Sequence, residues 1–269
     1  MEYYLALACG SIEMTTNYSR PCTSGEMGEY FEGDMLLTAA QREAITEAMY
    51  ADSRNGVRDV TRRWPNRTVL YHINEDDFVQ RIEDAIADIA NKSCLTFRRR
   101  QNKEEHGKNK GCFSKVGLVK ASDDGEENQI LNLSEKCFKH GTIVHEMLHS
   151  LGFYHMQSTY DRDDYVIIVW ENIKPGHRHN FNKYSNESVT NFDVPYDYGS
   201  VMHYGPTAFA INKQNKTIIP IKENVTIGQR KGLSEGDILK LNKMYCEETE
   251  DKENAIENNS GDKVAVIEK

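Results

Sequence analysis

Three histidines and a glutamate within residues 145–155 have the types and spacing of a catalytic zinc site. On an α-helix, His145 and His149 project from one face because they are four residues apart, so one zinc ion can bind both imidazoles. Glu146 would then lie beside the metal, where a carboxylate can act as general base toward water. Gly152 lets the chain turn after the helix and return His155 as a third ligand. Three protein ligands leave a coordination position open, as catalytic zinc sites require.

A second motif strengthens this interpretation. Two histidines and a glutamate can also occur on a helix with solvated side chains, but the added glycine and third histidine leave little room for that alternative. Downstream, residues 200–204 read Ser-Val-Met-His-Tyr. An extended zinc motif followed by a methionine turn is typical of the metzincin proteases. Residues 141–173 and 200–204 resemble the astacin family, and the resemblance runs from about Phe31 to Cys246.

This resemblance implies one zinc ion per chain, with Met202 as an apolar floor beneath the histidine ligands. It also implies that Tyr204 is a further ligand that swings away to stabilise the transition-state oxyanion. A phenol can bind zinc weakly and can donate a hydrogen bond to a developing negative charge. The alternative is that Tyr204 is a core tyrosine whose hydroxyl is satisfied. His203 has no assigned chemistry and is interpreted as structural.

The sequence departs from the family just after the third histidine. Met156 stands where the family has a glutamate, and Thr159 stands where it has an arginine. In the family, that glutamate anchors the buried amino terminus of the mature enzyme through water. We therefore expect an active enzyme whose mature amino terminus is held differently or is mobile.

Three acids follow this segment and could suggest a calcium loop. Asp161, Asp163 and Asp164 would need a glycine at the sixth and a glutamate at the twelfth position of an EF-hand loop. Those positions hold Val166 and Asn172. The acids are therefore interpreted as groups that form hydrogen bonds within a loop.

Composition limits the class of protein. The chain has 269 residues, with 38% hydrophobic and 28% charged residues, which suits a soluble globular protein of one or two domains. Its net charge of −9 makes nucleic acid an unsuitable partner. No apolar run approaches the length of a membrane span, so no membrane partner is expected. Residues 248–269 are rich in acids and poor in apolar side chains, and they are predicted to be disordered.

Cysteines and glycosylation signals indicate a secreted, extracellular protein. Four cysteines in the expected protease domain allow three pairings, and the astacin resemblance selects Cys94 with Cys246 and Cys112 with Cys137. The alternative is free buried thiols in a cytosolic protein. Asn-x-Ser/Thr sequons occur at Asn17, Asn66, Asn91, Asn132, Asn186, Asn215, Asn224 and Asn258. Residues 1–10 are interpreted as a weak signal peptide with a short apolar core and no basic residue before it.

Residues 11–54 are predicted to be a pro-segment. Residues 31–34 read Phe-Glu-Gly-Asp, and astacin pro-segments carry Phe-x-Gly-Asp, whose aspartate binds the zinc. Asp34 would therefore act as a zymogen switch, and its alternative role is that of a turn residue before a helix. Thr38 and Gln41 form a capping-box pattern that opens this helix, which should run to Tyr50. Cys22 has no assigned role.

The protease domain is expected to span residues 55–247, released by a trypsin-like protease that cuts Arg54–Asn55. Periodicity predicts strands at 69–73, 95–98, 112–119 and 130–133, and helices at 77–91, 140–151 and 235–245. The expected fold is α+β. By the resemblance it is a two-lobed metzincin domain: a twisted, mostly N-terminal sheet, the zinc helix at the cleft floor, and an irregular C-terminal lobe. Substrate would lie in the cleft as an added strand.

The leading functional hypothesis is a secreted, zinc-dependent endopeptidase that acts on proteins or peptides, is made as a zymogen and works as a monomer. The second hypothesis is a secreted binding protein or toxin that kept the fold without catalysis. A third is a protease of another metzincin branch, which the Phe-x-Gly-Asp and Ser-x-Met-His-Tyr elements disfavour. A digestive or venom role is a reasonable expectation from the similarity to invertebrate members.

Overall fold

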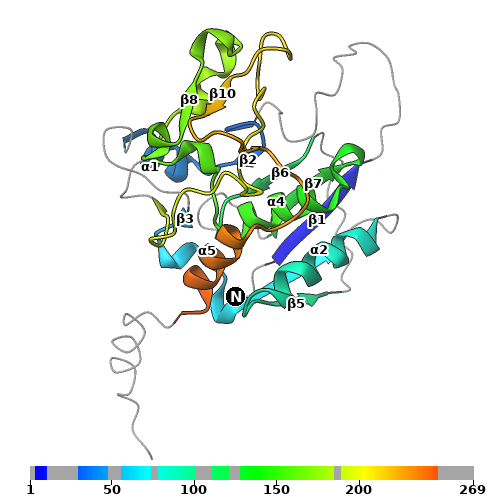
Figure 1. Cartoon of the computed structure of the whole chain (residues 1–269). Helices are drawn as coiled ribbons and strands as arrows, with labels where there is room; N and C mark the ends of the chain where they lie inside the picture. Colours follow the sequence, from blue (N-terminus) through cyan, green and yellow to red (C-terminus); the bar gives the residue numbers. More distant parts are fainter. Residues whose placement is uncertain are drawn as a thin grey trace, which may run out of the picture.

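The computed structural model describes residues 4–10, 30–47, 56–73, 78–100, 111–120, 128–184 and 189–247 (Figure 1). The α-helices within these ranges are α1 (Ala39–Glu47), α2 (Val79–Asn91), α4 (His140–Ser150) and α5 (Glu235–Tyr245). The strands are β1 (Tyr4–Gly10), β2 (Met35–Leu36), β3 (Gly56–Val57), β4 (Thr68–Ile73), β5 (Thr96–Arg99), β6 (Phe113–Lys115), β7 (Asn128–Ser134), β8 (Val166–Ile168), β9 (Val189–Thr190) and β10 (Ile218–Pro220). This mixture of helices and small sheets confirms the predicted α+β class.

The largest sheet has six strands in the order β2-β6-β7-β1-β4-β5. Every neighbouring pair is parallel except β6 and β7. β4 alternates as its sequence predicts, with Val69, Tyr71 and Ile73 buried, because successive side chains of a strand point to opposite faces. α4 packs against β6 and β7, and α2 packs against α4 and β5. The two helices therefore cover the same face of the sheet.

β1 occupies a central position in this sheet. It pairs in parallel with β7 on one side and with β4 on the other. Its residues belong to the segment that the sequence led us to interpret as a weak signal peptide. A short unbroken apolar run is typical both of a signal-peptide core and of a strand inside a parallel sheet, so the sequence alone does not separate the two.

The capping box at the start of α1 forms as predicted. The Thr38 amide donates to Gln41 Oε1 at 3.0 Å, and the Gln41 amide donates to Thr38 Oγ1 at 3.2 Å. The Gln41 side chain also donates to the carbonyl of Val116 at 2.9 Å, which ties α1 to the protease domain. The predicted helix end at Tyr50 lies outside the described residues.

The chain between α4 and α5 forms the irregular lobe that was predicted. Its described part consists mainly of 3₁₀ turns and short strands, including the antiparallel pair β8 and β10. In Figure 1 this pair lies at the top of the molecule, away from α2 and β5. α5 then returns to the side of the sheet domain, where a disulfide joins Cys94 to Cys246 at a Cα–Cα distance of 5.6 Å.

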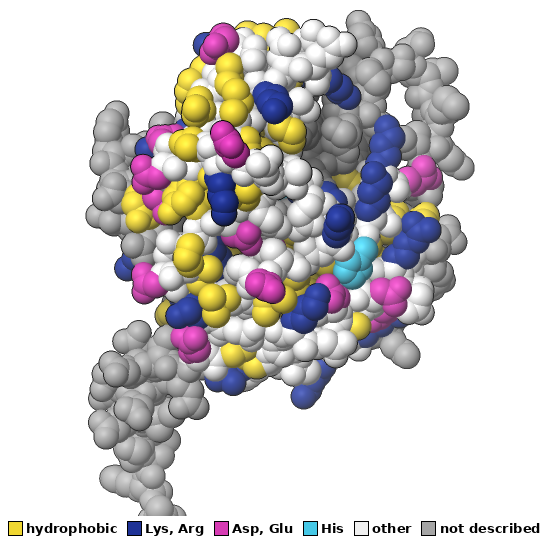
Figure 2. All heavy atoms as spheres, viewed as in Figure 1, with side chains coloured by type: hydrophobic (Ala, Val, Ile, Leu, Met, Phe, Trp, Pro, Cys, Tyr) yellow, Lys and Arg dark blue, Asp and Glu magenta, His cyan; other side chains and the backbone are white. Residues whose placement is uncertain are grey.

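This lobe carries most of the large apolar side chains that are exposed in the described part of the chain. They are Ile167, Trp170, Ile211, Ile219 and Ile221. Figure 2 shows apolar side chains at the top of the molecule, with basic and acidic side chains among them. The lobe therefore presents a mixed surface on this face rather than a continuous apolar one.

Both disulfides have the pairing that the family resemblance implied. Cys94 precedes β5 and Cys246 follows α5, so this bond closes a loop of 152 residues around most of the protease domain. Cys112 and Cys137 join the start of β6 to the turn that precedes α4. Closing a long loop restricts the unfolded chain most, with an effect of about 4–5 kcal/mol in the entropy model.

The strand predicted at residues 112–119 is shorter than expected. β6 ends at Lys115 because Gly117 adopts a φ of +66°, which interrupts an extended strand. Beyond it, the side chain of Gln129 hydrogen-bonds to the Gly117 carbonyl at 2.8 Å and to the Val119 amide at 3.0 Å. These side-chain bonds replace the ladder that a continued strand would make.

Several sequence predictions fall outside the described residues. They concern the acidic tail at 248–269, the Arg54–Asn55 bond and the sequons at Asn17, Asn186 and Asn258, and Cys22 lies there too. Within the described part of the chain, no helix is both long and apolar enough to cross a membrane.

A buried lysine lies against Met156, the residue that follows the predicted ligand His155. Lys240 of α5 is 2% exposed, and its Nζ lies 3.2 Å from the sulfur of Met156. Burial lowers the pKa of Lys240 to about 8, although the charges of Asp237, Asp197 and Asp161 act in the opposite direction. The contact places an ionisable amine beside the residue that replaces the family glutamate.

We predict that the free energy of unfolding rises between pH 8 and pH 9.5 because of Lys240. In this range the unfolded chain keeps its proton on the lysine while the folded protein loses it, so higher pH favours folding. The gain should be roughly 2 kcal/mol by pH 9.5. Denaturant titrations at several pH values would measure it. The Lys240→Met variant should lack this increment, and an equal rise in both proteins would contradict the prediction.

Candidate active site

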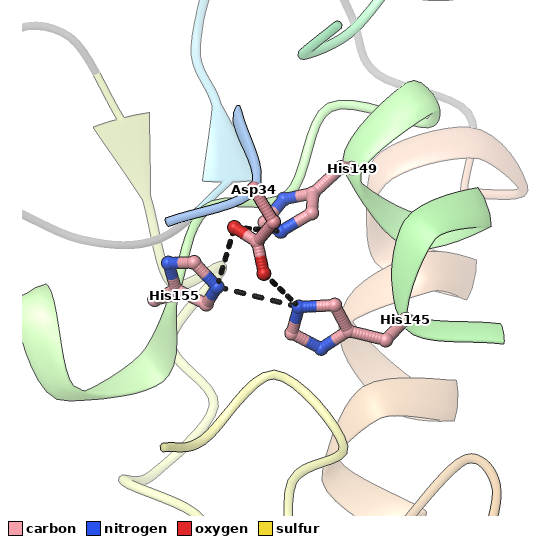
Figure 3. A group of neighbouring side chains, drawn as sticks. All are labelled: Asp34, His145, His149 and His155. Carbon is pink, nitrogen blue, oxygen red and sulfur yellow. Dashed lines mark hydrogen bonds and ion pairs between the residues drawn. The ribbon is translucent and has the colours of Figure 1, made fainter. Parts of the chain in front are cut away.

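α4 carries two of the predicted metal ligands on one face. Residues 141–150 are all buried, and His145 and His149 have no exposed surface. Their ring centroids lie 4.7 Å apart, as expected for residues one helical turn apart. Figure 3 shows both imidazoles projecting from α4 toward the same point. Glu146, the predicted general base, is also fully buried on this helix.

Gly152 makes the turn that the motif predicted. Its φ is +101°, a conformation that side chains with a Cβ rarely adopt. Its amide donates to the His149 carbonyl at 2.8 Å, which closes the end of α4. A Cβ at this position would lie 2.6 Å from a methyl group of Val57. The turn therefore needs glycine for both its backbone conformation and its packing, and it leads directly to His155.

The structure brings the three histidines together with Asp34 of the predicted pro-segment (Figure 3). One ligand atom from each of the four residues lies within 4.8 Å of the others, and all four side chains are buried. The Asp34 carboxylate lies 3.2 Å from His145 Nε2, 3.5 Å from His149 Nε2 and 3.3 Å from His155 Nε2. All four side chains thus meet at a single buried point.

Backbone carbonyls orient the two helical imidazoles. His145 Nδ1 lies 2.8 Å from the Val201 carbonyl, and His149 Nδ1 lies 2.6 Å from the Phe153 carbonyl. A carbonyl oxygen can only accept, so each Nδ1 carries the hydrogen in the neutral ring. Each Nε2 then presents a lone pair toward the centre of the cluster. This is the tautomer that a metal-binding histidine requires.

The third imidazole is oriented by a carboxylate. His155 Nδ1 lies 2.8 Å from Glu32 Oε2, so its Nε2 also faces the cluster. The Nε2 atoms of His155 and His145 are only 3.3 Å apart. Two inward lone pairs at this separation repel each other unless a proton or a cation lies between them. The donor set therefore fits a zinc ion, which takes imidazole nitrogen and carboxylate oxygen ligands.

The charges in the polypeptide alone show the same need for a cation. Burial alone would lower the pKa of His155, but the carboxylates of Asp34 and Glu32 raise it to about 9. Burial dominates at His149 and lowers its pKa to about 4. Burial also disfavours the ionised form of Asp34, yet the three histidines hold its pKa well below the usual range. Asp34 is therefore a carboxylate, and the positive charge that balances it is either a proton on His155 or a metal ion in its place.

Glu32 is a functional residue that sequence reasoning missed. It has no exposed surface and a φ of +49°. Its Oε1 accepts from Ser158 at 2.9 Å, and its backbone carbonyl accepts from the hydroxyl of Tyr204. It occupies the variable position of Phe-x-Gly-Asp, where the motif sets no residue type. The only available signal was an acid two residues before the predicted switch Asp34.

The methionine turn at 200–204 is held by a residue of α5. Asp237 accepts from the Ser200 hydroxyl at 2.6 Å and from the Val201 amide at 2.8 Å. It also completes a capping box with Ser234 at the start of α5. Because the Val201 carbonyl holds His145, Asp237 positions a candidate ligand through the turn. Its sequence signal was the Ser-x-x-Asp pattern before the last helix.

The other residues of this turn are buried. Met202 is 1% exposed, and its carbonyl accepts from the Met156 amide at 3.0 Å. Tyr204 is also buried, with its ring centroid 4.6 Å from that of His155. His203 hydrogen-bonds to the Tyr196 hydroxyl at 2.7 Å, and burial lowers its pKa to about 4. His203 is therefore a neutral residue with a structural hydrogen bond, in line with the sequence interpretation.

One of the acids after the third histidine, Asp163, forms contacts within its loop. Asp163 is paired with Arg162 at 3.0 Å and with Lys183 at 2.8 Å. The Arg162 guanidinium also donates to the carbonyls of Gln157 and Phe181. These contacts fold the loop back on itself through protein groups, as expected for acids that form hydrogen bonds within a loop.

The described strand of the predicted pro-segment, β2, lies at the edge of the sheet beside this cluster. β2 directly follows Asp34 and pairs in parallel with β6, with Met35 opposite Ser114. The Ser114 amide donates to the Asp34 carbonyl at 2.9 Å. This pairing extends the sheet by one strand and fixes Asp34 above the histidines.

Comparisons with known proteins agree with this geometry. A family model described as astacin, a family of peptidases, matches residues 56–246. Seminal metalloprotease 1 of Drosophila melanogaster is 41% identical over 231 residues, which cover 81% of this chain and 90% of that protein. Zinc metalloproteinase nas-4 of Caenorhabditis elegans is 35% identical over 228 residues, covering 81% of this chain and 70% of that protein. The chain spans half or less of some longer curated relatives.

A solved structure with the same architecture is high choriolytic enzyme 1, a hatching enzyme zinc-protease from Oryzias latipes. It shares 37% identity with this chain, with a TM-score of 0.58, and the match covers 68% of this chain and 92% of the enzyme. The structure of myroilysin matches at 18% identity with a TM-score of 0.50, which supports the fold alone.

We predict that Asp237→Asn weakens metal binding and activity, although residue 237 is assigned no contact with metal or substrate. Losing the charge loosens the Ser200–Val201 turn, and therefore the acceptor that orients His145. Outer partners of metal ligands are worth about 10–100-fold in affinity, and this more remote residue should be worth about tenfold. Competition with a chromogenic chelator would measure zinc affinity. The exposed Glu235→Gln on the same turn of α5 is the control, and equal affinity of the two variants would contradict the prediction.

Proposed function

The chain belongs to the astacin family of zinc metalloproteases, and from this premise we propose that it is a secreted endopeptidase made as a latent zymogen. Membership makes it a zinc metalloendopeptidase acting on peptide bonds. The observation that carries the latent form is the carboxylate of Asp34, which lies within 3.5 Å of all three histidine Nε2 atoms.

His145, His149 and His155 would hold the zinc ion through Nε2, because each Nδ1 is already engaged by an acceptor. Asp34 would be the fourth ligand in the latent form, and its departure would open one position. When bound, zinc supplies Lewis-acid chemistry that activates water and polarises the scissile carbonyl. Burial of the whole cluster favours tight binding, since the ligands are oriented before the ion arrives.

Glu146 would take a proton from the attacking water and deliver it to the leaving amine. Its position on α4, directly after His145, places a carboxylate beside the ligands. Tyr204 would donate a hydrogen bond to the oxyanion of the tetrahedral intermediate. In the latent form that hydroxyl donates to the Glu32 carbonyl instead. The pro-segment would therefore block both the open zinc position, through Asp34, and the hydroxyl of Tyr204.

Activation would require a cut that frees the Phe31–Asp34 segment. A trypsin-like protease acting at Arg54–Asn55 would separate the pro-segment, residues 11–54, from a domain of residues 55–247. The structure supports this border through β3, which begins at Gly56. The Val57 amide donates to the Gly152 carbonyl at 2.8 Å, so the start of the domain contacts the turn that precedes His155.

Secretion is supported by the two disulfides and by the exposure of several sequons. Asn66, Asn91, Asn215 and Asn224 are exposed and accessible to a glycosyltransferase. Asn132 has no exposed surface, and its side chain donates to the Gly111 carbonyl at 2.6 Å. This sequon therefore cannot carry a glycan in the folded protein.

Protein or peptide substrates would bind along β6 once β2 has left that sheet edge. An extended peptide satisfies the freed backbone groups of an edge strand by adding one more strand. A single chain contains every residue assigned to the site, so the proposed enzyme acts as a monomer.

Casein hydrolysis tests this proposal. The full chain should be inactive, gain activity after tryptic conversion at Arg54, lose it to a zinc chelator and regain it with zinc. No activity after conversion, with one zinc ion still bound, would instead indicate a binding protein that kept the fold.

We predict that Glu146→Gln abolishes most turnover and leaves zinc binding intact. The amide keeps the size of the side chain but cannot take a proton, and general-base catalysis contributes about 10²–10⁴-fold. Parallel measurements of kcat on a fluorogenic peptide and of zinc content would separate the two effects. Unchanged kcat would exclude Glu146 as the base.

Two pro-segment variants should lose latency to different extents. Asp34→Ala removes the carboxylate ligand and should raise activity before conversion by at least about tenfold, since charged contacts of this kind are worth a kcal/mol or more. Glu32→Gln keeps Asp34 but weakens the hold on His155 and Ser158, and it should give a smaller rise. Glu43→Gln, an exposed change in α1, is the control. Full latency in Asp34→Ala would refute the switch.

A further inference from the structure

The central strand of the large sheet comes from the N-terminal side of the proposed cleavage site. Tyr4 to Gly10 lie opposite Asn128 to Ser134 of β7 in a seven-residue parallel register. On the other side, Leu5 to Leu7 lie opposite Tyr71 to Ile73 of β4. Among the described strands, only β1 pairs with both β7 and β4. The two halves of the sheet are therefore joined through β1.

We propose that β7 and β4 form an acceptor slot for the Tyr4–Gly10 strand, and that this strand stays bound after the pro-segment is cut. The active enzyme would then carry its own N-terminal peptide as a non-covalent partner. The second half of this inference rests on the proposed zymogen cleavage, whereas the slot itself does not.

The position of β1 in the sheet distinguishes it from β2. β2 lies at the outer edge and pairs with β6 alone, so its departure exposes only one edge. Removing β1 would leave backbone groups of both β7 and β4 unpaired inside the sheet, which costs free energy on two sides. The pro-segment side of the chain therefore has two parts with different roles: an edge strand that can leave and a central strand that holds the sheet together.

The sequence of β1 suits a permanent central strand. Residues 4–10 read Tyr-Leu-Ala-Leu-Ala-Cys-Gly, without a charged side chain. Unbroken apolar runs are typical of strands inside parallel sheets, whereas edge strands usually carry charges. β4 offers matching surroundings, since Tyr71 and Ile73 are buried.

The strand also supports the catalytic site through β7. β7 ends at Ser134 and leads through the 3₁₀ turn Glu135–Cys137 into α4, which begins at His140. α4 packs directly on β7. Loss of β1 would loosen β7 and, through it, the helix that carries His145 and His149. Removal of these residues as a signal peptide would therefore separate β7 from β4 and divide the sheet in two.

A cut between β1 and the Asp34 segment tests the slot directly. A recognition sequence for a site-specific protease is inserted between Thr16 and Asn17 of the full chain, which is then cut and run on native size exclusion. We expect the N-terminal peptide to co-elute with the domain, and the amides of β4 and β7 to remain protected in hydrogen exchange. A free peptide beside a folded domain with protected β4 and β7 amides would overturn the proposal.

Matched variants test whether strand pairing is what retains the N-terminal peptide. Leu7→Pro removes a backbone donor and cannot continue a central strand, so the peptide should be released and exchange in β4 and β7 should speed up by at least about tenfold. Leu7→Val should retain the peptide. Cys9→Ser should also retain it, and release in that variant would show a disulfide link instead and overturn the non-covalent slot.

Conversion at Arg54 then tests the bound strand and the protease activity independently. Tryptic conversion at Arg54 should yield active enzyme that still contains residues 4–10 by intact mass. A retained peptide in an inactive product would refute the protease and leave the slot standing. Full activity in a secreted protein that begins after Gly10 would refute the slot and leave the protease standing.

Discussion

Three imidazole lone pairs that converge at one buried point are the constraint on which the structure depends. Each Nδ1 is engaged by an acceptor, so each Nε2 faces inward, and two of these atoms lie 3.3 Å apart. Such a cluster is stable only around positive charge. In the proposed zymogen, a zinc ion would provide that charge, and the Asp34 carboxylate would balance part of it.

The fold maintains this convergence through contacts between distant segments. α4 holds two ligands by its helical repeat, the Gly152 turn returns the third, and α5 anchors the acceptor of His145 through Asp237. Glu32 is the acceptor for His155, and its backbone carbonyl accepts from the hydroxyl of Tyr204. In the proposed zymogen, latency and ligand orientation would therefore depend on the same contacts. Release of the proposed pro-segment would leave His155 Nδ1 to bind another partner, such as water.

The local parts of this account were predictable from sequence, and the long-range parts were not. The spacing of His145, His149 and His155 predicts the site, because the helix and the turn that bring them together are local structures. The limits of α5 and the α+β class were also correct, since amphipathic periodicity and capping are local signals. Glu32 was missed because its partner His155 lies 123 residues away, and no local pattern encodes that pair. Asp237 is part of a local capping pattern, but this pattern does not reveal its contact with Val201, 36 residues away. β1 was ambiguous for a related reason, because an apolar run does not reveal which strands will pair with it.

X-ray absorption at the zinc edge tests the central claim most directly. For the full chain, the account predicts one zinc ion with three imidazole nitrogens and one carboxylate oxygen in its coordination shell. After conversion at Arg54, the three imidazoles should remain while the carboxylate is replaced by another oxygen ligand. Asp34→Ala should show the same change without conversion. Fewer than three imidazoles in either form, or identical spectra for the parent chain and Asp34→Ala, would contradict the account.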